Sequence, residues 1–254
     1  AWTGVEMLVW GGREPAGPAR ADGAAYDPIA DRWRLLAPAP LAAVSPAASV
    51  LAAGEWVVLA GDDLVPSNRA AAYDPAADSW RLVAELPFPV TEATALWTGA
   101  EVVVLGADTT GSDPTRTRAA AWDPARDAWR MLPAAPVNGL AAAAVWTGEE
   151  IVTWDFELRS AALAPAGEPT WEPLPDLPLV LYECDPLGTA AGDLVYAEHC
   201  GQGALWYRST RSWVRLTHPK TLSSQPHWTG NELLFWMGRF VDSADGIWRF
   251  MPSG

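Results

Sequence analysis

Three stretches of the chain are near copies of one another, and they read AAYDPIADRWRLL at residues 24–36, AAYDPAADSWRLV at 71–83 and AAWDPARDAWRML at 120–132. Asp-Pro followed by a second aspartate is turn chemistry, because proline fixes φ and the carboxylate accepts hydrogen bonds from nearby amides. Each stretch therefore predicts a strand, a tight turn and a second strand that opens with tryptophan. Degenerate copies read TWEPLP from Thr170, ALWYRSTRSWVRL from Ala204 and GIWRFMP from Gly246.

A second signature, a turn glycine followed by a short apolar run, precedes each of these six stretches. The glycines are residues 4, 54, 99, 148, 192 and 230. Glycine supplies the positive φ that a tight hairpin needs, and short runs rich in Val, Leu and Trp are typical of buried strands. Each unit is therefore predicted to hold four short antiparallel strands, the first two joined at the glycine.

Six such sheets suggest a radial arrangement, because a sheet with two apolar faces needs a neighbour on each side. We predict an all-β, six-bladed propeller of four-stranded antiparallel blades around a central axis. One tryptophan per unit is expected to fill the space between blades, although carbohydrate stacking is an alternative role. These residues are Trp33, Trp80, Trp129, Trp171, Trp213 and Trp248.

The repeats resemble the kelch family, whose pattern pairs Gly-Gly after the second strand with Tyr-Asp-Pro and a later tryptophan. In the first unit Gly11-Gly12, Tyr26-Asp27-Pro28 and Trp33 match this pattern. Later units depart from the Gly-Gly pair, which puts their loop conformations in doubt.

The expected organisation is one domain over 1–254, with blades at about 1–40, 41–87, 88–133, 134–175, 176–216 and 217–254. We expect the inner strand of the first blade to be truncated, or to be preceded by a further segment. We also expect the sequence to end just past a fourth strand, and the two termini to meet in space.

Charge and composition exclude some classes of protein. The chain has 31 acidic and 17 basic residues and a net charge of −14, which argues against nucleic-acid binding. No apolar run is long enough for a membrane helix. We expect a monomer whose partners are proteins, polar small molecules or glycans. A single lysine, Lys220, among many arginines suggests a GC-rich bacterial genome.

The two cysteines, Cys184 and Cys200, each lie eight residues from Gly192, the turn between them. Residues equidistant from a hairpin turn face one another across the ladder, within disulfide range. We predict a cross-strand disulfide and hence an extracellular, periplasmic or cell-envelope protein. Two buried free thiols are one alternative, since register can slip. A reactive or metal-binding pair with His199 is another, and no spaced Cys/His cluster supports zinc.

In kelch propellers the loops after the second strand share one face with those joining successive blades, and ligands usually meet that face. Aligned on the second strand, the repeats place a ring of candidate ligand-binding residues there: Arg13, Asp62, Asp108, Glu157, His199 and Arg239. Neighbouring candidates are Asp63, Asp155, Glu198, Tyr182, Phe156, Ser45, Thr91, Glu92, Asn138, Glu183, Asp185 and Lys220. Arginine and carboxylates together suit a sugar or a zwitterion, although polar loop residues are often merely solvated.

No catalytic constellation stands out, so the sequence favours a binding or interaction module without a cofactor or a metal. The resemblance implies an alternative, a sugar-active enzyme similar to the bacterial kelch sialic-acid mutarotases, with arginine and carboxylate pairs for acid–base work. Copper chemistry of the galactose-oxidase kind finds little support among three histidines. A cation-binding channel lined by the acidic arc is a further possibility.

Overall fold

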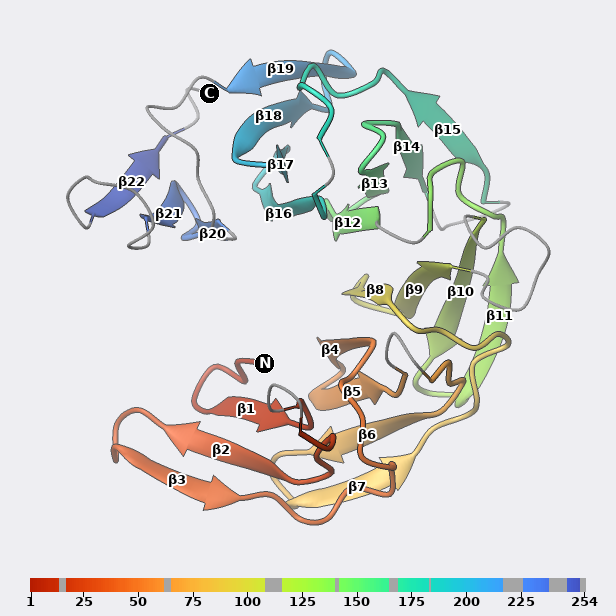
Figure 1. Cartoon of the computed structure of the whole chain (residues 1–254), viewed down its shortest axis with the longest axis vertical. Helices are drawn as coiled ribbons and strands as arrows, with labels where there is room; N and C mark the ends of the chain where they lie inside the picture. The colour runs from red at the N-terminus through yellow and green to blue at the C-terminus, as the bar shows by residue number, and fades with distance from the viewer. Residues whose placement is uncertain are drawn as a thin grey trace. The chain divides into compact units, whose positions relative to one another are not determined.

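Antiparallel hairpins follow one another along the whole chain in the computed structural model (Figure 1). The structure describes residues 1–13, 17–61, 65–107, 116–139, 142–164, 169–182, 184–216, 226–237 and 246–251, with the backbone alone at 236–237 and 246–248. The chain divides into two compact units, Ala1–Ala134 and Ala135–Gly254. No helix long and apolar enough to cross a membrane occurs among the described residues.

The first unit holds three sheets, each with its strands in chain order. Sheet 1 contains β1 (Met7–Trp10), β2 (Gly23–Asp27) and β3 (Arg32–Leu35). Sheet 2 contains β4 (Ala48–Ala52), β5 (Glu55–Leu59), β6 (Ala70–Asp74) and β7 (Ser79–Leu82). Sheet 3 contains β8 (Ala93–Trp97), β9 (Val102–Ala107), β10 (Thr117–Asp123) and β11 (Ala128–Leu132).

The second unit repeats this organisation. Sheet 4 contains β12 (Ala142–Trp146), β13 (Ile151–Asp155), β14 (Ser160–Leu163) and β15 (Trp171–Leu174). Sheet 5 contains β16 (Leu187–Ala191), β17 (Leu194–His199), β18 (Gln202–Tyr207) and β19 (Ser212–Leu216). Sheet 6 contains β20 (His227–Trp228), β21 (Leu233–Met237) and β22 (Gly246–Phe250). Six antiparallel sheets of three or four strands confirm the predicted six-bladed β-propeller fold.

The Thr-Gly turns form as the sequence predicts. In the first, the Thr3 hydroxyl accepts a hydrogen bond from the Glu6 amide at 2.9 Å, and Gly4 has a φ of 98°. The same threonine-to-glutamate bond closes three other turns, those of Thr98, Thr147 and Thr229. The positive φ explains why glycine stands at the second turn position.

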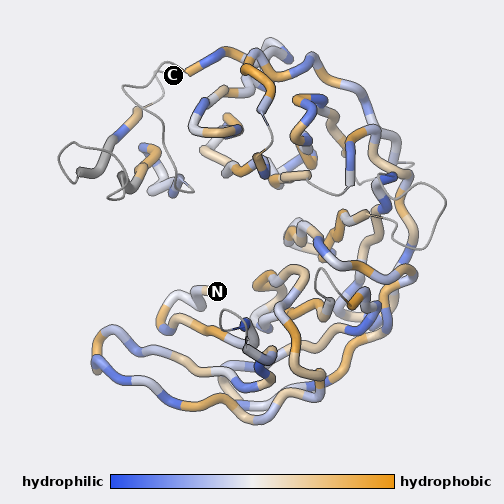
Figure 2. The backbone as a smooth tube through the Cα atoms, viewed as in Figure 1, coloured by the Kyte–Doolittle hydropathy of each residue, from blue (hydrophilic) through white to orange (hydrophobic). Residues whose placement is uncertain are grey.

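Within the first unit, apolar side chains of neighbouring sheets pack face to face. One core cluster joins sheets 1 and 2 through Leu8, Trp10, Trp56 and Tyr73, and a second joins sheets 2 and 3. Hydrophobic stretches accordingly recur in every sheet in Figure 2. A buried aromatic side chain contributes both apolar area and, for tryptophan, a donor that needs a partner.

The fourth-strand tryptophans donate to the sheet before them. The indole N–H of Trp80 bonds the Ala37 carbonyl oxygen at 2.9 Å, and that of Trp129 bonds the Ala84 carbonyl oxygen at 2.8 Å. A hydrogen bond also runs the other way, from the preceding sheet to the second aspartate of the turn. The Ala84 amide donates to the Asp127 carboxylate at 2.9 Å. These tryptophans therefore fill the space between sheets, as predicted, and also connect the sheets by hydrogen bonds.

In the second unit an arginine replaces that aspartate. Arg211 has a φ of 47°, close to the 48° of Asp127, and likewise lies two residues before the fourth-strand tryptophan. Its guanidinium lies 2.8 Å from the carboxylate of Glu172, on β15, and 3.5 Å from that of Glu150, which directly precedes β13. The indole of Trp213 donates to the Ser160 hydroxyl of sheet 4 at 3.1 Å.

Three sequence predictions need correction. Trp33 is 54% exposed, so it is not a buried filler like Trp213. Trp248 lies on β22, which pairs with β21 and is a third strand, because Phe250 and not Trp248 occupies the register position of Tyr26. Met251, which was expected to follow a fourth strand, therefore follows a third. Sheet 1 has three strands, and Trp2 contributes a single bridge to Met7.

We expect Asp127→Ala to lower the free energy of unfolding by about 1–3 kcal/mol, because the Ala84 amide and the Trp122 indole N–H lose their acceptor. The matched control is Asp31→Ala, since Asp31 has the same φ of 48° and accepts from Tyr26 in its own sheet. Urea denaturation measures both. Equal losses would mean that the left-handed backbone, and not the bond between sheets, accounts for the effect.

Candidate functional site

The predicted ring of ligand-binding residues is only partly within the described residues. Arg13, Glu157 and His199 are described, whereas Asp62, Asp108 and Arg239 lie outside, as do Asp63, Glu183 and Lys220. Arg13 belongs to the first unit, is exposed and forms an isolated bridge with Ala19. Glu157 and His199 belong to the second unit, at the ends of sheets 4 and 5. The ring as a set remains a prediction.

Glu157 belongs to a cluster of charges in the turn between β13 and β14. Asp155 is fully buried and accepts hydrogen bonds from the Arg159 side chain at 2.9 Å and from the Asn138 amide at 2.7 Å. Arg159 also lies 3.0 Å from the Glu157 carboxylate, whose oxygen accepts from the Asn138 amide group at 3.3 Å. Asp155 therefore anchors the half-exposed Arg159 side chain, which in turn pairs with the half-exposed Glu157.

The disulfide between Cys184 and Cys200 is present, with the two Cα atoms 5.6 Å apart. This confirms the predicted bond and contradicts the free-thiol and reactive-pair alternatives. The predicted ladder position is wrong, however, because Leu187 pairs with Glu198 and the register is offset by one residue. Cys184 precedes β16, and Cys200 lies in the turn between β17 and β18. The bond thus ties a connecting segment to a turn.

We define the connecting segment as residues 177–182 with Cys184, between sheets 4 and 5. It starts beside the charge cluster, since the Leu177 amide donates to the Leu158 carbonyl oxygen at 2.9 Å. It then passes the β17–β18 turn, where Gln202 bonds both the amide and the carbonyl oxygen of Val180, at 3.1 and 3.0 Å. The segment therefore bridges two turns of neighbouring sheets.

His199 holds the far end of the segment. Its side chain is fully buried, and its Nε2 lies 2.8 Å from the carbonyl oxygen and 3.2 Å from the amide nitrogen of Tyr182. According to its tautomer, Nε2 donates to the oxygen or accepts from the N–H. Its Nδ1 is buried without a hydrogen-bond partner in the described part of the chain. His199 thus positions Tyr182 from beneath the segment.

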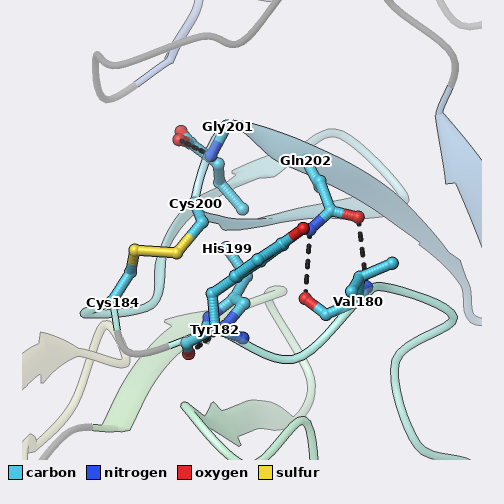
Figure 3. The surroundings of a disulfide bond; sticks show 8 residues. Val180, Tyr182, Cys184, His199, Cys200, Gly201 and Gln202 are labelled. Atoms are coloured by element: carbon cyan, nitrogen blue, oxygen red, sulfur yellow. Dashed lines mark hydrogen bonds between the residues drawn. A yellow bond between two sulfur atoms is a disulfide. The ribbon is translucent and has the colours of Figure 1, made fainter.

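The segment turns three side chains toward solvent. Val180, Leu181 and Tyr182 are 47%, 57% and 56% exposed. Figure 3 shows the Tyr182 ring pointing along the β17–β18 turn toward Gln202, with the disulfide at the other end. Sequence reasoning named Tyr182 and the cysteines but missed Val180, Leu181 and Gln202. The apolar run of residues 177–182 outside any glycine-marked hairpin was the available signal.

A second polar pair lies on the opposite face of β17. Tyr196 and Glu198 are buried, and the Tyr196 hydroxyl and the Glu198 Oε2 have no hydrogen-bond partner among the described residues. Gly203 pairs with Glu198, and its missing side chain leaves room for the Tyr196 ring. Burial raises the pKa of Glu198 to about 7, against a smaller opposing effect of the Gly201 amide, and burial also raises the pKa of Tyr196.

Within the described ranges, no group of three or more His, Cys, Asp or Glu side chains is arranged to hold a metal ion. The described group best suited to acid–base chemistry is the Glu198 carboxyl, whose pKa burial raises to about 7. No arginine is bonded to it among the described contacts. The site combines a held surface segment, an anchored ion cluster and one buried carboxyl.

Comparison with known proteins bears on the fold. No protein-family model matches the chain, and no curated protein matches its sequence. Among solved structures the chain is similar to YjhT, with a TM-score of 0.64 and 14% identity over 91% of this chain and 86% of that one. At this identity the likeness concerns the fold alone, and it agrees with a β-propeller.

The raised pKa of Glu198 predicts how stability depends on pH. Because the folded state keeps its proton up to about pH 7 while the unfolded carboxyl loses it near 4.5, folding is favoured at low pH. Between these values stability should fall by roughly 2–3 kcal/mol as pH rises. Glu198→Gln, which stays neutral, should flatten this part of the profile. Parallel slopes for the two proteins in urea denaturation from pH 4.5 to 8 would contradict the assignment.

Proposed function

We propose that this protein is a non-catalytic binding module of the kelch type, exported by a bacterium, that contacts a protein partner or polar ligand with the loop ends of sheets 4 and 5. The observation that carries the proposal is the held connecting segment. A disulfide and side chains from two positions of the adjacent turn fix its backbone, and Val180, Leu181 and Tyr182 remain exposed.

Holding a contact surface before binding raises affinity, because less conformational entropy is lost when the partner arrives. Tyrosine suits such a surface, since it offers a large rigid ring and a polar hydroxyl with few rotatable bonds. Single exposed apolar residues are ordinary, but three in succession on a fixed backbone are not. Arg159 and Glu157, at the start of the segment, add a polar edge for a charged or hydroxylated ligand.

The disulfide is compatible with an extracellular or periplasmic location, where such bonds persist. The net charge of −14 favours partners with a basic surface and disfavours nucleic acid. Both points support a module that works in the cell envelope or outside it. The same proposal treats all 254 residues as one functional propeller. It also keeps Arg13, Asp62, Asp108 and Arg239 as further candidate ligand-binding residues.

One observation favours a second function, a sugar-active enzyme similar to the kelch sialic-acid mutarotases. Glu198 is buried, lacks a partner for Oε2 and has a pKa of about 7, which suits a general acid or base at neutral pH. An arginine opposite this carboxyl would strengthen the case, and none is bonded to it among the described contacts. Anomer interconversion of sialic acid by the wild-type protein and its loss in Glu198→Gln would support this alternative.

Tyr182→Ala should weaken ligand binding at least tenfold, because it removes the largest exposed side chain of the held segment. Ligands are first sought with the oxidised protein on a glycan array that includes sialic acids and by thermal shift with sugars. Candidate protein partners are titrated by calorimetry. The control is Val214→Ala, which removes a 50% exposed side chain from β19 of the same sheet.

Binding that Tyr182→Ala leaves unchanged would place the contact surface elsewhere and contradict the proposal. Binding to a protein with silence across all sugars would exclude the enzyme alternative and support the interaction module. Loss of affinity in both variants would point to a general effect on sheet 5, which far-UV circular dichroism of each variant checks.

A further inference from the structure

The disulfide connects two places that take no part in the ladders of sheet 5. Cys184 lies three residues before β16, and Cys200 lies between β17 and β18. The pairings of β16 with β17 and of β17 with β18 run from Leu187 to Tyr207 without either cysteine. Breaking the sulfur–sulfur bond therefore removes no strand pairing. What it removes is the covalent end of the connecting segment.

The remaining bonds that hold the second half of the segment are hydrogen bonds to its backbone. The amides of Val180 and Tyr182 bond the side chains of Gln202 and His199, and the Cys184 amide donates to the Tyr182 carbonyl oxygen at 3.1 Å. Segments with exposed backbone hydrogen bonds and few buried apolar contacts open at low free energy. Leu177 and Leu179 pack on the core cluster of sheets 4 and 5 and hold the first half of the segment. Val180, Leu181 and Tyr182 are exposed, so little apolar burial holds the second half, where the covalent link lies.

Cys200 occupies a turn position at which cysteine is not among the favoured residues. Cys200 and Gly201 form the two-residue turn with φ values of 50° and 72°. Turns of this kind favour Asn or Asp followed by Gly, and a cysteine in the left-handed region costs backbone free energy. From this position Cys200 forms the disulfide with Cys184.

The bond is open to reagents in solution. Cys184 is exposed and Cys200 is half-buried. A thiolate of a dithiol reductant can attack Cys184 Sγ, so that the sulfur–sulfur bond breaks and Cys200 leaves as a thiolate. The second thiol of the reductant then displaces Cys184 from the mixed disulfide. Two electrons and two protons pass to the protein, which gains two thiols, and the reductant becomes a cyclic disulfide.

We infer that the Cys184–Cys200 disulfide is a redox latch, which holds the connecting segment as a binding surface when oxidised and releases it when a dithiol reduces it. Sheet 5 stays folded in both states. The biological meaning of the latch rests on the proposed function, since the segment carries the proposed contact residues. The structural change itself does not depend on any ligand.

Amide hydrogen exchange of the full chain, before and after reduction with dithiothreitol, tests the latch. Complete reduction is established by counting two titratable thiols. We expect exchange at Val180, Tyr182 and Cys184 to rise at least tenfold, and exchange within β17 and β18 to change less than twofold. The Cys184→Ser, Cys200→Ser double variant should behave like the reduced protein in the presence and absence of dithiothreitol.

Unchanged exchange at the three amides after full reduction would overturn the inference, because His199 and Gln202 would then suffice to hold the segment. A comparable rise throughout β17 and β18 would also overturn it, since the disulfide would then be a staple of the whole sheet. Neither result depends on the ligand screen. The two proposals can fail separately. If reduction raises exchange as expected but Tyr182→Ala binds its ligand normally, the proposed function is refuted and the latch is supported.

Discussion

A tryptophan indole N–H donated from the fourth strand of one sheet to the sheet before it is the interaction on which the described structure most depends. A sheet with two apolar faces is stable only when neighbours cover them. Trp80, Trp129 and Trp213 cover such a face and at the same time fix the angle at which the sheets meet, because each N–H has one acceptor in the preceding sheet. Packing alone would leave that angle less defined.

The turn before each of these tryptophans makes a second contact with the preceding sheet, and the residue that makes this contact changes along the chain. In the first unit an aspartate accepts a backbone N–H of the preceding sheet. In the second unit Arg211 takes that place, and Glu172 of sheet 4 takes the place that Arg34 of sheet 1 holds opposite Asp78. The two charge changes compensate each other, so attraction between the sheets is kept.

The sequence predicts the strands, the glycine turns and the disulfide, because each depends on residues close together or in a fixed repeat. It fails where the outcome depends on contacts between distant segments. The offset of Leu187 against Glu198 moves both cysteines out of the ladder, and no local pattern encodes a shift of one residue. Trp248 carries the tryptophan–arginine pair of a fourth strand yet pairs with β21 as a third. Gln202 reaches the backbone of Val180 across 22 residues, and such bonds leave no periodic signal.

The candidate site was predictable to a similar degree. Aligning the repeats identified Glu157 and His199 as loop-end residues. It could not show that Arg159, anchored by Asp155, pairs with Glu157, or that His199 is buried beneath Tyr182. Burial of Glu198 without a partner for Oε2 likewise follows from tertiary packing against Tyr196 and Gly203 and from nothing in its own segment.

Backbone ¹⁵N relaxation of the oxidised protein measures whether the segment between sheets 4 and 5 is a rigid surface. We expect order parameters of about 0.85 for Val180, Leu181 and Tyr182, equal to those of the adjacent strand β17. Values below about 0.6 at these three residues would mean that the segment is mobile despite its disulfide and hydrogen bonds, and that it is not a preformed binding surface.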